Sequence, residues 1–345
     1  MIRKVLKIAV VGCGYWGPNH IRTFSRLPGV QVAAAVDRDP VRLRSMLELV
    51  PSLWLSQEPI EVLNSRDIDA VVLATPTATH YELARRSLLA GKHVLCEKPL
   101  CLRADEAREL NAIARERELV LMVGYTFLFN AGIAKLRTLI ANGELGDLFH
   151  LSAVRTNLGP IRNDVNAVYD LATHDVSIFN WLLDAVPTRV LAAGGAFIRK
   201  DIEDVATVCL EYPKGIFGTI HVSWLNPRKV RQISVVGARR MATWDDLELS
   251  TPIAIYDRGA AVTPDVREYG EFLRVDTWDG DVRLPKLNLE EPLKLQARFF
   301  VEGALKGRVE RANGDFSVGV MATVEAAVAS LRAGRRIDID AGLTR

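Results

Sequence analysis

The chain has 345 residues, of which 49% are hydrophobic and 25% are charged, with ordinary numbers of glycine and proline. This composition excludes collagen-like, disordered and low-complexity proteins, and the length predicts two domains. Lys and Arg total 44 against 42 Asp and Glu, so the net charge of +2 offers no general attraction for nucleic acid or an acidic membrane.

The first third of the chain alternates strands with helices. Residues 6–11 form an apolar run typical of a strand buried on both faces, and glycines follow it directly. Further strands are predicted at residues 32–36, 70–74, 93–96 and 119–123, and helices at residues 18–27, from 41, at 59–64, at 81–89 and up to 115. This alternation predicts a doubly wound parallel sheet of the Rossmann type, in a first domain over residues 1–124.

The pattern changes after Gly124, where strand-like runs follow one another. The first of these runs ends at Val154, and the others cover residues 189–193, 205–212, 216–222, 231–236 and 240–244. The helices expected here lie at residues 133–141, 171–183, 292–305 and 316–331. Residues 257–291 lack a period and are expected to form loop or irregular strand. The pattern predicts an α+β domain over residues 125–345, with a large, mostly antiparallel open sheet.

Nothing in the sequence indicates a membrane span or a disulfide scaffold. No apolar run approaches the roughly 18 residues needed to cross a bilayer, and the apolar stretch near the N-terminus reads as a strand. The four cysteines form no Cys-x-x-Cys pair and no zinc-finger spacing. We therefore expect a cytoplasmic protein whose partners include neither nucleic acid nor membrane.

The turn after the first strand carries Gly12, Gly14 and Gly17 in the spacing G-x-G-x-x-G. Between a strand and a helix, these glycines permit a tight turn, a close approach to a pyrophosphate and close packing of helix on strand. Asp37 ends the second strand 20 residues after Gly17, where a carboxylate accepts hydrogen bonds from ribose hydroxyls. The pattern predicts NAD rather than NADP, because a ribose phosphate would meet a like charge, although the neighbouring Arg38 softens this choice.

Polar residues follow the next two predicted strands, with segment 75–80 after one and segment 97–99 after the other. Ligands of open α/β sheets bind beyond the carboxyl ends of the strands, so both segments are placed to reach the dinucleotide. The candidate dinucleotide contacts are Gly12, Gly14, Tyr15, Trp16, Gly17, Asp37, Arg38, Thr75, Pro76, Thr77, His80, Glu97 and Lys98.

Asp170 and His174 lie four residues apart at the start of a predicted helix, so their side chains share one face. A carboxylate beside an imidazole suits the histidine to accept and return a proton. The same spacing also fits an N-cap, here Asp170, beside a surface histidine. Asp175 is expected to point about 100° away from His174 into solvent. The sequence has no HExxH motif and no Cys/His quartet, so no metal site is predicted.

The strings GCGYWG, ATPTATH, CEKP and YDLATHD together resemble the Gfo/Idh/MocA family, the relatives of glucose-fructose oxidoreductase and inositol dehydrogenase. The resemblance extends over nearly the whole chain. It implies a Rossmann domain and an α/β domain whose open sheet forms dimers or tetramers, with substrate bound between the domains. It also implies that Lys98 holds the reacting hydroxyl, that Asp170 orients, and that His174 is the acid-base group. Ala172 replaces the glycine of the family pattern D-x-G-x-H, which affects the placement of His174.

The segments GYTFLFN from Gly124 and VRTNLGPIRNDVN from Val154 resemble a branch that oxidises the C3 hydroxyl of amino sugars. The substrate contacts this implies are Lys98, Tyr125, Arg155, Asn157, Arg162, Asn166, Asp170 and His174. The implied activity is oxidation of a nucleotide-linked N-acetylhexosamine, its uronic acid or an aminoglycoside, with NAD as oxidant. The sequence leaves two alternatives: an NAD-dependent glycosidase of the same fold, and a non-catalytic NAD-sensing regulator.

Overall fold

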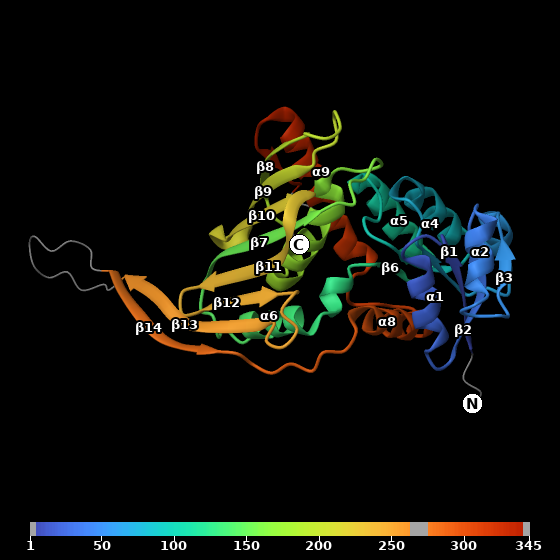
Figure 1. Ribbon diagram of the computed structural model, residues 1–345, viewed down its shortest axis with the longest axis horizontal. Coiled ribbons are helices and arrows are strands. Elements are labelled where there is room, and N and C mark those ends of the chain that lie inside the picture. The colour runs from blue at the N-terminus through green and yellow to red at the C-terminus, as the bar shows by residue number, and fades with distance from the viewer. Residues whose placement is uncertain (1–4, 263–274, 341–345) are drawn as a thin grey trace, which may run out of the picture. The chain divides into compact units, whose positions relative to one another are not determined.

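The structure is a computed structural model that describes residues 5–262 and 275–340 (Figure 1). The chain divides into two units. Unit 1 comprises Met1–Phe129 and Glu290–Glu325, and unit 2 comprises Asn130–Leu289 and Ala326–Arg345. This division differs from the expected one, in which the second domain runs without interruption from residue 125 to the end of the chain.

Unit 1 contains a six-stranded parallel sheet in the order β3-β2-β1-β4-β5-β6, which confirms the predicted doubly wound fold. Its strands are β1 (Leu6–Val11), β2 (Val30–Val36), β3 (Trp54–Ser56), β4 (Ala70–Leu73), β5 (His93–Cys96) and β6 (Leu121–Val123). The helices between them are α1 (Gly17–Ser25), α2 (Pro40–Met46), α3 (Pro59–Leu63), α4 (His80–Leu89) and α5 (Ala104–Glu116). The strand order reverses between β1 and β4, and ligands of such sheets bind beyond the carboxyl ends of the strands at this point.

A later helix, α8 (Pro292–Lys306), also belongs to unit 1 because its apolar face completes the core there. Phe300 of α8 meets Phe24 of α1 edge-to-face at 6.2 Å, and both side chains are fully buried. Phe316, in the first part of α9 (Gly314–Ala333), likewise packs at 5.8 Å on Tyr125. Sequence order alone could not show that these helices return to the first sheet.

Contrary to the expectation from the sequence, helix α9 is long and apolar enough to cross a membrane, by length and composition alone. In the structure, 67% of that apolar stretch is buried in the protein. The division between the units falls within this helix, between Glu325 and Ala326. Helix α9 therefore has the burial expected of a core helix.

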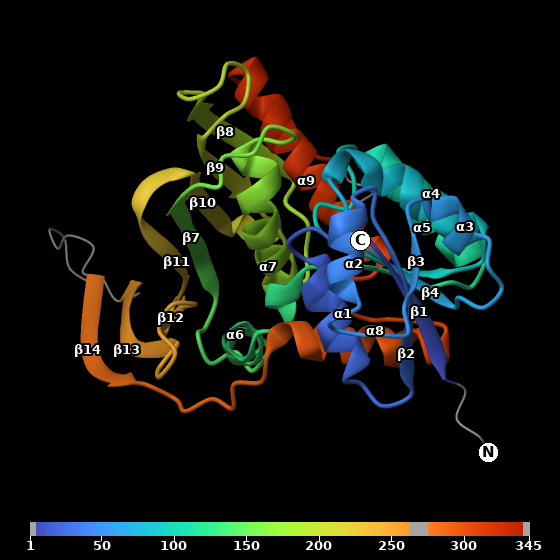
Figure 2. The same cartoon turned by 45° about the vertical axis from the view of Figure 1, so that its right-hand side comes forward.

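Unit 2 contains a nine-stranded sheet in the order β14-β13-β12-β11-β7-β10-β9-β8-β15, in which only the pair β7 and β10 is parallel among the described strands. Its strands are β7 (Leu148–Leu158), β8 (Arg189–Gly195), β9 (Val205–Glu211), β10 (Phe217–Ser223), β11 (Leu225–Gly237), β12 (Met241–Asp245), β13 (Ile253–Val262), β14 (Val275–Arg283) and β15 (Ile337–Asp338). Helices α6 (Ala131–Ala141) and α7 (Thr173–Leu183) lie against one face of the sheet (Figure 2). The mostly antiparallel sheet predicted for this part of the chain is confirmed.

Strands β13 and β14 occupy much of the segment expected to be loop or irregular strand. Gly259 pairs with Trp278 across this hairpin, and a Cβ at Gly259 would lie 2.2 Å from the indole. The aromatic ring thus covers a glycine, which weakens the alternating hydrophobic pattern that identifies strands. Part of the expected loop, residues 263–274, lies outside the described residues.

Candidate active site

The three positions after β1 require glycine for different reasons. Gly12 has a φ of +97°, and a Cβ there would lie 2.5 Å from the oxygen of Ala74, while a Cβ on Gly17 would lie 2.0 Å from the oxygen of Gly12. Gly14 has open space, since the nearest atom to a Cβ there is the Nη1 of Arg42 at 3.9 Å. Packing therefore requires Gly12 and Gly17, whereas Gly14 leaves a bare stretch of backbone that fits a pyrophosphate.

Replacing Gly14 with alanine tests this assignment. Because the added methyl has room, we expect Gly14→Ala to fold with an unchanged melting temperature, yet to raise the Kd for NAD at least about tenfold by blocking the phosphates. Titration calorimetry measures the Kd and differential scanning fluorimetry measures the melting temperature. Gly17→Ala is the contrast, since its clash with backbone should lower the melting temperature as well. Unchanged NAD affinity in Gly14→Ala would contradict the assignment.

Asp37 lies beside the glycine turn at the end of β2. Its Oδ2 accepts a hydrogen bond from the Cys13 backbone N at 2.7 Å, and its Oδ1 accepts one from the Asp39 N at 2.9 Å. Burial, followed by the charge of Asp37, raises the pKa of the Cys13 thiol to about 12, so this thiol stays protonated. Each Asp37 oxygen keeps acceptor capacity, which fits hydrogen bonds from a ribose.

The other predicted contacts near this turn differ in exposure. Tyr15 and Trp16 meet edge-to-face at 5.5 Å at the start of α1, and both are exposed. Arg38 is exposed, and its carbonyl accepts a hydrogen bond from Gln57 Nε2 at 2.9 Å. Three of the predicted aromatic and basic groups are thus available at the surface beside the glycine turn.

His80 and Glu97, both predicted as dinucleotide contacts, are buried. The His80 side chain is 1% exposed, with Nδ1 2.8 Å from the Pro99 carbonyl oxygen and Nε2 2.8 Å from the Thr75 carbonyl oxygen. Glu97 is buried, and its Oε1 lies 2.8 Å from Nε2 of the fully buried His20. Sequence reasoning missed His20, because nothing in the sequence shows that α1 faces the end of β5.

Lys98 lies two residues after the end of β5 and is partly exposed. Its backbone N donates a hydrogen bond to Glu97 Oε2 at 3.3 Å. Thr75 and Pro76, at the end of β4, are also partly or fully exposed, whereas Thr77 is buried. The carboxyl ends of β4 and β5 therefore carry an ammonium group and a hydroxyl group at the edge where ligands of such sheets bind.

In unit 2, Asp170 does not cap α7 as expected. It lies within a π-helical turn (Val168–Ala172) that leads into α7, and such turns are frequent at functional sites. Its Oδ1 accepts a hydrogen bond from Arg162 Nη1 at 3.2 Å, and its Oδ2 accepts one from Trp224 Nε1 at 3.1 Å. His174, in the first turn of α7, is partly exposed.

Arg162 also pairs with Asp164, through Nε at 2.9 Å and Nη2 at 2.6 Å. The guanidinium holds the pKa of the Asp164 carboxyl below its ordinary value, mainly by this hydrogen bonding. The same bond, partly offset by burial, raises the pKa of Arg162. Arg162 thus stands between two carboxylates, which gives unit 2 a partly exposed charged cluster.

Three of the implied substrate contacts are buried in this fold. Arg155 forms a bidentate pair with Asp175, at 2.8 Å for both bonds, and each side chain is 2% exposed. The expectation of a solvated Asp175 is therefore wrong. Tyr125 is fully buried, and burial raises its pKa. Asn166 is buried and donates to Glu203 Oε2 at 2.6 Å. Arg155 and Asn166 thus have protein partners for their polar groups, and the Tyr125 side chain packs in the interior.

Asn157 is partly exposed and donates through Nδ2 to the Gly159 carbonyl at 2.5 Å.

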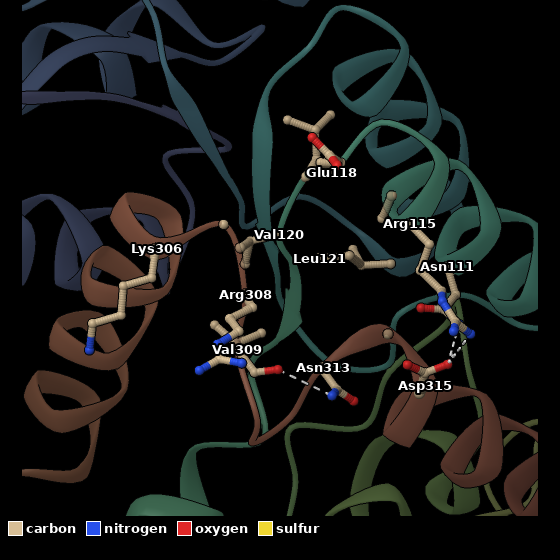
Figure 3. Close-up of a pocket in the computed structure, with 14 residues that line it drawn as sticks. Asn111, Arg115, Glu118, Val120, Leu121, Lys306, Arg308, Val309, Asn313 and Asp315 are labelled. Atoms are coloured by element: carbon tan, nitrogen blue, oxygen red, sulfur yellow. Dashed lines mark hydrogen bonds and ion pairs between the residues drawn. The ribbon is translucent and has the colours of Figure 1, made fainter.

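No group of three or more His, Cys, Asp and Glu side chains in the described part of the chain is arranged to hold a metal ion. A cavity of about 590 Å³ opens elsewhere on unit 1, between the C-terminal half of α5, the start of β6 and the α8–α9 loop (Figure 3). The cavity contains none of the predicted site residues.

The sequence of this chain is similar to those of known proteins. The family model described as "Oxidoreductase family, NAD-binding Rossmann fold" matches residues 6–125, and the "GFO/IDH/MocA C-terminal domain" matches residues 133–243. UDP-N-acetylglucosamine 3-dehydrogenase of Acidithiobacillus ferrooxidans is 29% identical over 264 residues, which are 76% of this chain and 80% of that protein. Inositol 2-dehydrogenase of Mycolicibacterium smegmatis is 36% identical over 185 residues, which are 52% of this chain and 53% of that protein.

Among solved structures, GenD2 from gentamicin A biosynthesis, in complex with NAD, matches with a TM-score of 0.82 and 28% identity. The match covers 99% of this chain and 98% of that one. Together the two family models span most of both sheets, and the glycine turn and Asp37 lie within the NAD-binding match. The chain therefore belongs to the Gfo/Idh/MocA family of oxidoreductases, and its cofactor is NAD.

Proposed function

We propose that this oxidoreductase is a sugar dehydrogenase that oxidises a secondary ring hydroxyl, at C3 of an amino sugar, to a ketone. The observation that supports this most is the similarity over most of both chains to UDP-N-acetylglucosamine 3-dehydrogenase and to GenD2. The charged cluster of Arg162, Asp164 and Asp170 adds support, because it offers partners of both signs to an amino sugar or a linked phosphate.

In this proposal His174 accepts the hydroxyl proton, and Asp170, one turn earlier, orients the substrate. Lys98 stabilises the developing alkoxide with its ammonium group. Bound NAD would supply a hydride acceptor at its nicotinamide ring. Asp37 and the backbone around Gly14 hold the adenosine and pyrophosphate ends of the dinucleotide.

Reduction of NAD in the presence of candidate substrates tests the proposal. UDP-N-acetylglucosamine, an aminoglycoside and myo-inositol are compared by NADH absorbance, and NMR then locates the new ketone. We expect turnover with one of the two amino-sugar classes and a ketone at C3. Turnover with myo-inositol alone would favour the second candidate, an inositol dehydrogenase, which the 36% identity to such an enzyme supports. Release of free sugar without NADH would indicate a glycosidase instead.

We further propose that the protein is a cytoplasmic homodimer or homotetramer that associates through the uncovered face of the unit 2 sheet. One row of paired residues crosses seven strands on this face without a charged side chain: Leu191, Cys209, Thr219, Ser152, Ser234, Thr243 and Ala254. Burial alternates along these strands, and the members of this row are partly or fully exposed. A row without charge across so many strands is typical of the core of a surface that is covered by a second copy, since charged residues are depleted there.

A charge in the middle of this row tests the interface. We expect Ser152→Glu to convert the oligomer to monomers, because a desolvated carboxylate would lie opposite an uncharged surface. Light scattering after size-exclusion chromatography gives the mass. Ser45→Glu, on the exposed surface of α2, is the matched control and should leave the mass unchanged. A monomeric wild type, or an unchanged oligomer in Ser152→Glu, would refute the interface.

A further inference from the structure

Two buried histidines contact the residues on either side of Lys98 in the chain. His20 contacts Glu97, which precedes Lys98, and His80 contacts Pro99, which follows it. On the preceding side, His20 Nε2 is 2.8 Å from Glu97 Oε1, and Glu97 Oε2 accepts the backbone N–H of Lys98. On the following side, His80 Nδ1 is 2.8 Å from the carbonyl oxygen of Pro99. We infer that His20 and His80 are positioning residues that hold the backbone of Lys98 from both sides; this inference rests on the proposed role of Lys98.

The surroundings of Glu97 are shaped to keep its carboxylate in place. A Cβ on Gly124 would lie 3.0 Å from Glu97 Oε2, so glycine at the end of β6 leaves the room that the carboxylate fills. His20 is fully buried, and its Nδ1 has no hydrogen-bond partner among the described residues. The imidazole therefore makes its hydrogen bond through Nε2, by donating to a carboxylate that only accepts.

His80 makes two contacts with different consequences. A carbonyl oxygen only accepts, so each of these two contacts is a hydrogen bond when the ring nitrogen that makes it carries a proton. The Nδ1 bond holds Pro99, next to Lys98, whereas the Nε2 bond holds Thr75, at the end of β4. We assign the first bond to the position of Lys98 and the second to the position of the NAD-binding turn at residues 75–77.

Asparagine and glutamine separate these contacts, because the amide nitrogen of asparagine replaces Nδ1 of histidine and that of glutamine replaces Nε2. His80→Asn keeps the donor to Pro99, and His80→Gln keeps the donor to Thr75. At residue 20 the order reverses, since only His20→Gln keeps the donor to Glu97. A general loss of stability would show no such crossed pattern.

The control is Lys92, which immediately precedes β5, the strand that leads to Lys98. Its Nζ donates to the carbonyls of Ser65 at 2.6 Å and Ile68 at 2.8 Å, and the side chain is 6% exposed. Lys92→Met removes two hydrogen bonds to carbonyls, as the loss of His80 removes two contacts with carbonyls, but at the end of β5 remote from Lys98. It should lower the melting temperature and leave Lys98 unaffected.

The first readout does not need substrate. Lysines are reductively methylated with ¹³C, and the Lys98 resonance is assigned as the one absent in Lys98→Ala. We expect this resonance to shift in His80→Gln and His20→Asn, and to keep its wild-type position in His80→Asn, His20→Gln and Lys92→Met. An unchanged Lys98 resonance in both His80→Gln and His20→Asn would overturn the inference.

The second readout separates kcat from cofactor affinity. With the substrate found above, we expect His80→Gln and His20→Asn to lower kcat about tenfold or more through misplacement of Lys98, while the Kd for NAD rises only in His80→Asn. If Lys98→Ala keeps the wild-type kcat, the proposed role of Lys98 fails, and the resonance pattern still decides whether the histidines position it. Equal loss of kcat in the Asn and Gln variants at each site would contradict positioning.

Discussion

Lys98→Ala is expected to lower kcat by about 10²–10⁴-fold with little change in the Kd for NAD, because the developing alkoxide loses its cationic partner. Lys98 is partly exposed at the carboxyl end of β5, so the truncation removes few packing contacts and the melting temperature should stay within a few degrees of wild type. His174→Ala, in the first turn of α7, should have an effect of similar size through loss of the base.

Steady-state kinetics at saturating NAD measure the loss, and calorimetry measures NAD affinity separately. Lys98→Arg is the matched variant: it keeps the charge but changes the shape of the cation, so it should recover only part of kcat. Near-normal turnover in both Lys98→Ala and His174→Ala would remove these residues from the mechanism.

Arg155→Met is expected to destabilise the protein by about 3–5 kcal/mol, because it leaves the Asp175 carboxylate buried without its partner. The pair is bidentate and both side chains are 2% exposed, so water cannot replace the guanidinium. Urea unfolding followed by circular dichroism measures the change, and the mid-point should fall for Asp175→Leu as well.

The double variant distinguishes a broken pair from a simple loss of packing. Arg155→Met combined with Asp175→Leu removes both charges, so it should recover most of the stability lost in each single variant. Arg189 forms an exposed pair with Glu211 and Asp338, and Arg189→Met should cost only a small fraction of the loss at Arg155. Additive losses in the double variant would contradict an ion-pair role.

The sequence predicted the first sheet well because its signals are local. Each strand is a short apolar run, and the glycines and Asp37 stand at fixed distances from strand ends. The buried hydrogen-bond partners of Arg155 and Glu97 could not be predicted in this way. Each is held by a residue distant in the chain or on another element, Asp175 and His20, and nothing in the spacing identifies those partners.

The role of Asp170 shows a second limit. The spacing of Asp170 and His174 fitted an ordinary helix start, in which an aspartate caps the first turn. The π-helical turn changes that geometry, and the carboxylate bonds Arg162 and Trp224 instead. Trp224 lies between β10 and β11, 54 residues later in the chain, so its indole N–H was not foreseeable as a partner.

Unit 1 is built from two separate segments of the chain, and this constrains when it can fold during synthesis. Phe300 covers Phe24, and Phe316 covers Tyr125, so a nascent chain that has emerged only as far as residue 129 still lacks part of its interior. The nucleotide-binding half cannot finish folding on the ribosome until nearly the entire polypeptide has been translated. An expression fragment cut near residue 129 would expose the aromatic side chains of Phe24 and Tyr125, and exposed aromatic surface promotes aggregation.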